Sequence, residues 1–509
     1  MKKFALFFLA LFLLVLSSCS EGDKYLPELI PQDVTYLVKI EGGQLMRKME
    51  YKDEKDQPVK NSFYLLQKII VQDKQMLAEL DTIFRSIDSY GIDLGKSFFA
   101  FESPTIHGLA FKVADSDRLK DRLISAGFVT DNKIQRKNGI GSFMYNKSIY
   151  FAWNKYQLLI VKYISDEEID LNATVRSFFR QKKERSITSN NAVRNLLSNG
   201  SDVAIYNTDV LINKLLKSNS KDEINFESVL VGCTPLTYIS FEKGEVKIEI
   251  DLIFGDEEKR TYTKKSFESI FKNSTGAHLA YFDKMPNAFQ TTNINGDSLK
   301  MQLNRDGLSK QIGAIPFINI NDIVSNLNGD ITLVQTIDST GNEIKYTFMI
   351  DLKDRNAMDN TLNQYSNPPT RFLKKTGANH FELPNSDYYL GIKDNMLYMT
   401  TDNSFEHNHL DKAYKLKDSL LVTQMKDNRV LFYGDSLSVS SMAQSYVNAM
   451  APANKMTGML DLIKSYSVVM DDNFRVSIDI QFSDKKKNSL ASVCEFMNRR
   501  NLYSALSNE

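Results

Sequence analysis

Imidazole and carboxylate groups come together once in the chain, at Glu406, His407 and His409, with Asp411 following. Two imidazoles and a carboxylate could hold a zinc or copper ion. A catalytic zinc site, however, needs three fixed protein ligands that other side chains orient. The preceding residues 402–405 are typical of a loop. We therefore interpret this cluster as a solvated polar loop with no metal assigned, and keep His407 and His409 as metal candidates in the alternative interpretation.

An apolar segment that runs into Gly-Asp-Ser-Leu at 434–437 suggests serine chemistry. The block resembles the nucleophile block of the GDSL esterase family, and that resemblance would make Ser436 the nucleophile. A serine hydroxyl is a poor nucleophile without a base to take its proton. The family provides that base from an Asp-x-x-His near the C-terminus, but here the last histidine, His409, precedes Ser436 and no Asp-x-x-His occurs. The constellation is incomplete, so we assign no catalytic residue.

A second Gly-Asp-Ser-Leu, at 296–299, favours a structural origin for both blocks. By its place in an internal repeat it corresponds to Gly-Gly-Gln-Leu at 42–45, which has no serine. Glycine permits a tight turn, and aspartate or serine caps the first N–H groups of a helix. Both blocks are therefore predicted to be strand-to-helix turns. An envelope hydrolase, GDSL-like or metal-dependent, stays as an alternative.

The remaining motifs concern calcium, sugar and phosphate. Two Asn/Asp-rich stretches, 319–322 and 326–330, lack the ligand spacing of an EF-hand loop and are predicted to be turns. The single tryptophan, Trp153, lies beside Tyr150 and Phe151 in an alternating segment, where aromatic rings more often fill a core than bind sugar. The sequence has no glycine-rich phosphate loop, and we predict no cofactor.

The N-terminus carries the most specific pattern in the chain. Two lysines and an unbroken apolar run, 4–16, have the layout of a secretory signal, and the run is shorter than the roughly 20 residues that span a bilayer. Leu-Ser-Ser-Cys at 16–19 then resembles the bacterial lipobox. By that resemblance Cys19 is lipidated and becomes the first residue of the mature chain, and two or three acyl chains give stable anchoring. We predict a lipoprotein signal peptide at 1–18 and a lipidated tether at 19–27.

Charge and cysteine content narrow the function classes further. The chain has 63 basic and 63 acidic residues, whereas a nucleic-acid binder would show a basic excess, so we expect no nucleic-acid partner. Only Cys233 and Cys494 remain besides Cys19, and two thiols in so long a chain do not make a disulfide framework. Whether they pair with each other stays open.

Hydrophobic spacing predicts the elements that must position these side chains. Residues 34–40 are predicted to be a first strand and residues 98–101 a later one. Residues 63–87 carry apolar side chains at helical spacing, which predicts a long amphipathic helix. Further on, 248–254 and 476–482 alternate apolar and polar residues, which is typical of antiparallel strands packed on one face.

Several segments recur in the same order along the chain. Residues 111–118 and 348–355 both end a strand in an Asp-rich turn that opens a helix. Residues 150–161 and 389–400 are both two short strands around a polar turn. These matches predict an α+β fold of two repeated modules, each a mainly antiparallel sheet with inserted amphipathic helices. The two modules are predicted to span 28–273 and 274–509.

The layout resembles a family of uncharacterised Bacteroidetes lipoproteins of about this length. The resemblance rests on the lipobox, on Ile-Pro-x-Asp at 30–33 before a Val-rich strand, and on Gly-Ile-Asp-Leu at 91–94 before an aromatic strand. The Asn/Lys-rich composition also fits that phylum. The family is a domain of unknown function, so the resemblance implies no catalytic residues.

We therefore predict a lipid-anchored cell-envelope lipoprotein that binds or scaffolds and does not catalyse. Its expected partners are a membrane, reached through lipid on Cys19, and an envelope protein or a glycan. A glycan-capturing surface lipoprotein is kept as an alternative. The expected location is the outer membrane, at its periplasmic face or on the cell surface.

Overall fold

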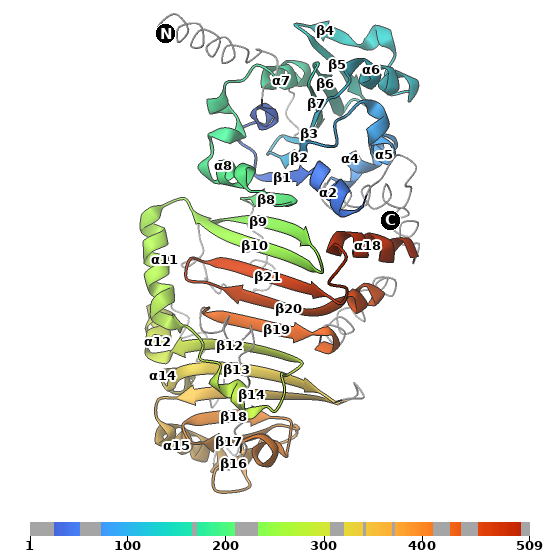
Figure 1. Ribbon diagram of the computed structural model, residues 1–509. Helices are drawn as coiled ribbons and strands as arrows, with labels where there is room; N and C mark the ends of the chain where they lie inside the picture. The colour runs from blue at the N-terminus through green and yellow to red at the C-terminus, as the bar shows by residue number, and fades with distance from the viewer. Residues whose placement is uncertain are drawn as a thin grey trace, which may run out of the picture. The chain divides into compact units, whose positions relative to one another are not determined.

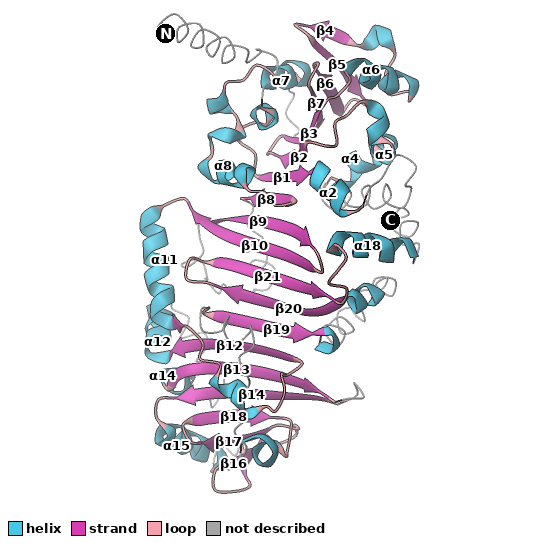
Figure 2. Cartoon of the chain, in the orientation of Figure 1, coloured by secondary structure: helices cyan, strands magenta, loops and turns pink. Residues whose placement is uncertain are grey.

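The computed structural model divides the chain into two compact units, which are described separately (Figure 1, Figure 2). The first holds the described residues of Met1–Asp209, Leu236–Phe241 and Val493–Glu509, and the second holds those of Val210–Pro235 and Glu242–Ser492. Each unit combines an antiparallel sheet with helices, so the predicted α+β class is confirmed. The structure describes residues 25–50, 73–164, 170–208, 233–305, 320–338, 343–368, 372–410, 428–438 and 457–499.

The first unit is built on one antiparallel sheet whose neighbouring strands follow the order β4–β5–β6–β7–β3–β2–β1–β8–β9. The strands β6 and β7 are buried along nearly their whole length, so both of their faces are covered. The predicted pair of strands at 150–161 is confirmed by these two. The strands are β1 Tyr36–Glu41, β2 Ser97–Glu102, β3 Ile106–Lys112, β4 Gln135–Lys137, β5 Ile140–Tyr145, β6 Ile149–Trp153, β7 Gln157–Tyr163, β8 Val203–Asn207 and β9 Cys233–Glu242.

Side-chain caps begin several helices of the first unit. Asp115 accepts hydrogen bonds from the N–H groups of Asp117 and Arg118 and opens α6, as the Asp-rich turn predicted. Asp170 caps α7, which packs against β5, β6 and β7. The helices are α2 Gly42–Lys48, α4 Lys74–Glu79, α5 Asp81–Arg85, α6 Ser116–Ser125, α7 Leu171–Phe178 and α8 Asn191–Ser198, with 3₁₀ turns at Leu26–Leu29, Ile87–Tyr90, Asp131–Lys133, Lys183–Arg185 and Ile187–Ser189.

The second unit has a longer antiparallel sheet in the order β10–β21–β20–β19–β12–β13–β14–β18–β17–β16–β15, with β11 beside the end of β12. The predicted strands at 389–400 are β17 and β18. The strands are β10 Glu245–Phe254, β11 Phe271–Lys272, β12 Ala288–Asn295, β13 Leu327–Ile337, β14 Ile344–Leu352, β15 Lys374–Lys375, β16 His380–Glu382, β17 Tyr389–Lys393, β18 Met396–Thr400, β19 Val430–Asp435, β20 Ile463–Met470 and β21 Arg475–Phe482.

Helices and turns cover both faces of that sheet. Met349 and Ile350 are neighbours in β14 and so point to opposite faces. Met349 belongs to a buried cluster with Leu279 and Phe405, and Ile350 to another with Met358 of α15. The helices of this unit are α11 Glu257–Ile270, α12 Gly296–Arg305, α14 Ile320–Ser325 and α15 Arg355–Ser366, with turns at Ala277–Tyr281, Glu406–Leu410 and Thr457–Leu462. A last helix, α18 Ser489–Arg499, contains residues of both units.

Two expectations differ from the structure. The described part of the predicted helix at 63–87 is not one helix: Asp73 begins α4 by accepting from the Met76 N–H, and the backbone leaves helical geometry at Leu80 and Ser86, so α5 and a 3₁₀ turn follow as separate elements. The two compact units are a different division from the predicted repeat, since the second unit already holds β10, which pairs with β21, and the repeat bounds 28–273 and 274–509 stay a prediction. The alternation at 248–254 does not separate two faces, since all of these positions are half-buried. No helix in the described ranges is long and apolar enough to cross a membrane.

Four glycines lie directly opposite aromatic residues on neighbouring strands. Two of the pairs are Gly108 with Phe101 in the first unit and Gly391 with Tyr398 in the second. A Cβ atom on Gly108 would lie 2.0 Å from Phe101 Cζ, so the ring occupies the space that any other side chain would need. The remaining two pairs are Gly141 with Trp153 and Gly434 with Tyr466.

Gly108→Ala is expected to destabilise the first unit by about 1–3 kcal/mol, because the Phe101 ring must move off its partner strand. Thermal unfolding followed by circular dichroism measures the effect. Gly200→Ala in the same unit is the control, because nothing lies within 4 Å of the added Cβ, and its effect should stay within about 0.5 kcal/mol. Equal loss in both variants would contradict the packing argument.

A partly buried ionic cluster lies at the start of α4. Asp73 accepts from His107 Nδ1 at 2.7 Å and from Lys162 Nζ at 2.9 Å, in addition to the Met76 N–H at 2.8 Å. Burial alone would raise the pKa of Asp73, but these three hydrogen bonds outweigh it and hold the pKa below its usual value.

Asp73→Asn is expected to lower the stability of the first unit at pH 7 and to matter progressively less below about pH 4. A carboxyl with a depressed folded-state pKa stabilises the fold above its unfolded pKa of about 3.9, and that stabilisation is lost as pH falls through the lower folded pKa. Urea unfolding at pH 7 and pH 3 tests this. Asp81→Asn, which removes only an exposed pair with Arg85, should have a small effect at both pH values.

Candidate functional site

Both Gly-Asp-Ser-Leu blocks lie where a strand passes into a helix, as predicted. Asn295 ends β12 and accepts from the Ser298 N–H at 3.0 Å, which begins α12. Asp435 ends β19 and accepts from the Ser438 N–H at 3.0 Å. The capping residue of the first block, Asn295, lies just before the block, whereas the capping residue of the second, Asp435, is the second residue of the block. Relative to the cap, Ser436 is therefore not at the position of Ser298. Their shared tetrapeptide therefore does not reflect a shared nucleophile position.

The described histidines contact groups other than the serines of the two Gly-Asp-Ser-Leu blocks. His107 contacts Asp73, and His380 Nε2 lies 2.9 Å from Glu406 Oε2. His409 Nδ1 lies 3.2 Å from the Tyr281 carbonyl oxygen. Within the described ranges, no histidine hydrogen bond or ion pair involves Ser298 or Ser436.

The predicted metal cluster is only partly described. His409 stacks on Phe405 and contacts Phe282 at a tilt, and its Nε2 is 4.0 Å from Asp402 Oδ2. The side chain of His407 and the whole of Asp411 lie outside the described part of the chain. Among the side chains that are described, no group of three His, Cys, Asp or Glu residues could hold a metal ion.

His380 lines a pocket of about 250 Å³ at the β16–β18 edge of the second unit. Its Nδ1 lies 3.3 Å from the Tyr398 hydroxyl. Burial raises the pKa of Tyr398 well above its ordinary range, and the nearby Glu406 carboxylate raises it further. The phenol therefore stays protonated and can donate a hydrogen bond. No serine or cysteine is among the described residues that line this pocket, so it offers acid–base groups without such a nucleophile.

His278 is the centre of a polar network that the sequence did not predict. Its Nε2 lies 3.0 Å from Asp351 Oδ1, and its Nδ1 lies 2.9 Å from Thr332 Oγ1. Thr332 Oγ1 is in turn 3.1 Å from Thr291 Oγ1. The order of carboxylate, imidazole and hydroxyl is the one that activates a hydroxyl nucleophile in hydrolases.

Burial excludes that chemistry for His278 and Thr332. Thr332 and Thr291 are 0% exposed and His278 is 2% exposed, so no substrate can reach the hydroxyl. The neighbouring Asp330, also 0% exposed, accepts from the N–H and hydroxyl of Thr275, the N–H of Gly276 and the amide of Asn293. These bonds satisfy polar groups inside the sheet, which is a structural role.

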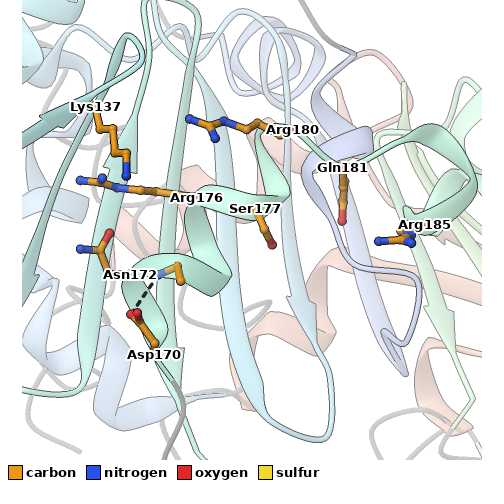
Figure 3. A pocket seen from close by; sticks show the side chains of 9 residues that line it. Lys137, Asp170, Asn172, Arg176, Ser177, Arg180, Gln181 and Arg185 are labelled. Atoms are coloured by element: carbon orange, nitrogen blue, oxygen red, sulfur yellow. Dashed lines mark hydrogen bonds between the residues drawn. The ribbon is translucent and has the colours of Figure 1, made fainter.

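A second pocket, of about 570 Å³, lies beside α7 in the first unit and is cationic (Figure 3). Its lining side chains come from three places: β4, the helix α7, and the segment that follows α7. The residues that line it are Lys137, Asp170, Asn172, Ala173, Arg176, Ser177, Arg180, Gln181 and Arg185. Four of these carry a positive charge and one a negative charge.

Neutral polar groups orient two of the side chains that line this pocket. Arg176 Nη2 donates to Ser142 Oγ at 2.8 Å and to Gln135 Oε1 at 3.3 Å. The Tyr150 hydroxyl donates to Asn172 Oδ1 at 2.5 Å. Burial raises the pKa of Tyr150, which keeps the phenol protonated as a donor. The guanidinium of Arg176 is thus oriented without being neutralised.

Sequence reasoning missed both the His278 network and the cationic pocket. A signal for the pocket existed, because five basic residues and a single acid occur between Arg176 and Arg185. The expectation for Trp153 was correct: it lies in β6 with 5% exposure, and it packs on Phe143 and over Gly141. A ring so buried cannot stack on a sugar from solvent. Cys233 and Cys494 are both buried, and no disulfide joins them.

Comparisons with known proteins give one family match. A family model described as "Domain of unknown function (DUF4836)" matches residues 27–490. A search of curated proteins finds no match.

Structural neighbours of the chain include solved structures of TP0453. Its crystal form I has 11% identity and a TM-score of 0.28 and covers 50% of this chain and 89% of that chain. Form IV has 8% identity and a TM-score of 0.24, covering 45% and 81%, and form III has 10% and 0.24, covering 49% and 89%. Similarities this low support no conclusion about this chain.

Asp330→Ala is expected to lower the stability of the second unit by at least about 3 kcal/mol, because it leaves several buried donors without an acceptor. Differential scanning calorimetry measures the loss. Ser436→Ala is the control: Ser436 is exposed, and its replacement should change neither stability nor any background hydrolysis of p-nitrophenyl acetate. Loss of hydrolysis in Ser436→Ala would contradict the structural assignment of the block.

Proposed function

The chain belongs to the DUF4836 family, a domain of unknown function, and we propose that it is a cell-envelope lipoprotein, anchored by lipid on Cys19, whose folded body binds or scaffolds. The observation that carries the anchor is the N-terminal pattern: a basic start, the apolar run 4–16, and a cysteine directly after Leu-Ser-Ser. The family match begins at residue 27, at the end of the expected tether, which supports a tether that is separate from the body.

The positions and contacts of the potentially reactive side chains support a binding function over a catalytic one. The two Gly-Asp-Ser-Leu serines lie at helix starts and contact no described histidine. In the carboxylate–imidazole–hydroxyl series of the second unit, the Thr332 hydroxyl is fully buried and His278 nearly so. A nucleophile needs both a base and access for its substrate. Among the described residues, none of Ser298, Ser436 and Thr332 has both a histidine base and access for a substrate.

The body is further proposed to be one module used twice. Strand order supports this, because neighbouring strands follow the same pattern in both units. The order is β8–β1–β2–β3–β7–β6–β5–β4 in the first unit and, strand for strand, β19–β12–β13–β14–β18–β17–β16–β15 in the second. Helices recur at matching places as well. Helix α2 follows β1 and α12 follows β12, while Asp115 and Asp354 cap the helices after β3 and β14.

The proposed location is the outer membrane of a Bacteroidetes cell, facing the periplasm or the exterior. The support is the lipobox-like segment together with the Asn/Lys-rich composition that resembles lipoproteins of that phylum. A lipid-anchored body works at a bilayer surface, so its ligand or partner is one that reaches that surface.

Cys19→Ser is expected to abolish anchoring. The wild-type chain should partition into the detergent phase of a Triton X-114 extraction and yield an acylated N-terminal peptide by mass spectrometry, whereas the variant should move to the aqueous phase. Ser20→Ala keeps the cysteine and serves as the matched control. A Cys19→Ser chain that still partitioned with detergent, or a wild-type chain without fatty acid, would overturn the anchor. Labelling whole cells with an impermeant reagent then separates exterior from periplasmic exposure.

A further inference from the structure

The cationic side chains of the α7 pocket have no described counter-ion. In the described ranges, which exclude 165–169, no ion pair involves any of them; they are Lys137, Arg176, Arg180 and Arg185. Asp170 is the one acid in the lining, and its Oδ1 accepts from the Ala173 N–H at 3.0 Å as the cap of α7. A concave surface lined by one sign of charge concentrates its field inward and attracts the opposite charge. The pocket therefore favours an anion.

The site is organised before any ligand arrives. Arg176 is oriented by Ser142, which is 0% exposed, and the helix that carries it packs against β5, β6 and β7. A guanidinium whose direction is already set loses little freedom when it binds, and this favours affinity. Arg180 and Arg185 are exposed and complete the rim.

The charge balance favours a phosphate over a carboxylate. The lining carries four positive charges and one negative charge. A phosphate monoester brings about −1.5 to −2 charges and three acceptor oxygens at neutral pH, so one group can pair with several of these donors. Guanidinium groups pair with phosphate through two parallel hydrogen bonds, which fits a pocket with three arginines.

Acceptor groups in the same pocket call for a ligand that also donates. The Ser177 hydroxyl gives its hydrogen to the Thr174 carbonyl oxygen at 2.7 Å, which leaves its oxygen able to accept. The second oxygen of Asp170 is an acceptor as well. The volume of about 570 Å³ lies in the range of sites for whole small molecules. Hydroxyl groups on the carrier of the phosphate would meet these acceptors.

We propose that this pocket binds a phosphate monoester on a hydroxylated carrier, which is either a soluble sugar phosphate or the phosphorylated head of a lipid. The inference rests on the proposed function, in which the body binds a ligand, and it names the class of that ligand.

The test is isothermal titration of the full mature chain in detergent with four soluble probes. Glucose 6-phosphate represents the soluble source, and glycerol 3-phosphate represents the lipid head. Glucose and glucuronate are the uncharged and carboxylate controls. We expect saturable binding of at least one phosphate probe, with the tighter probe identifying the source. Glucose should give no saturable heat, and glucuronate should bind at least about tenfold more weakly.

Paired variants locate the binding. Arg180→Gln with Arg185→Gln should weaken the better phosphate probe by at least about tenfold, because it removes two charged donors from the rim. Lys96→Gln with Arg122→Gln removes two exposed charges from the same unit outside the pocket and should change affinity by no more than about twofold. Raising the salt concentration should weaken binding in the wild type, since the rim is exposed.

Three results would overturn the proposal. They are no saturable binding of either phosphate up to about 10 mM, equal binding of glucuronate, and equal losses in the pocket and control variants. The titration does not depend on where the protein resides, whereas the Cys19→Ser fractionation does not depend on the pocket. A failure of one therefore cannot be mistaken for a failure of the other.

Discussion

Each unit depends on antiparallel pairing between strands that lie far apart in the sequence. Tyr36 in β1 faces Asn207 in β8, and Ala288 in β12 faces Gly434 in β19. Such pairs satisfy the backbone N–H and C=O groups of the sheet interior, which no short hairpin could do alone. Helices such as α12 begin where these strands end, so strand pairing fixes the position of the cap at Asn295. It also fixes the strands β5, β6 and β7, against which α7 packs.

Buried pairing also explains why the reactive-looking side chains are not reactive. When a sheet is covered on both faces, the hydroxyls, imidazoles and carboxylates at its interior positions must satisfy one another. Thr291, Thr332 and His278 do so in the second unit, and Asp330 ties the loop at Thr275 to the same strands. A series that would be catalytic at a surface becomes, at this depth, a way to keep polar atoms bonded.

Local chemistry could be predicted from the sequence. Helix caps and tight turns depend on residues a few positions apart, so their patterns can be recognised in the sequence. Examples are the caps at Asp115 and Asp354 and the turns at 154–155 and 393–395. The pairing of 248–254 with 476–482 could not be predicted, because alternation shows that a segment is a strand and says nothing of its partner.

The same reasoning explains the errors in detail. Asp73 begins α4, and its carboxylate also meets His107 and Lys162, whose sequence positions give no hint of that contact. The His278 network joins four segments, and no single segment carries a motif. Arg475 likewise pairs with Asp251 across 224 residues.

Overall charge conceals the cationic pocket for a physical reason. The sum of 63 positive and 63 negative residues describes the chain seen from far away, whereas a ligand at a surface feels charges within the screening distance of about 8–10 Å. The fold has placed Lys137 from β4 in one pocket with the arginines of α7 and of the segment after it. A balanced composition therefore argues against binding a long polyanion along the whole surface, and leaves open a local site for one small anion.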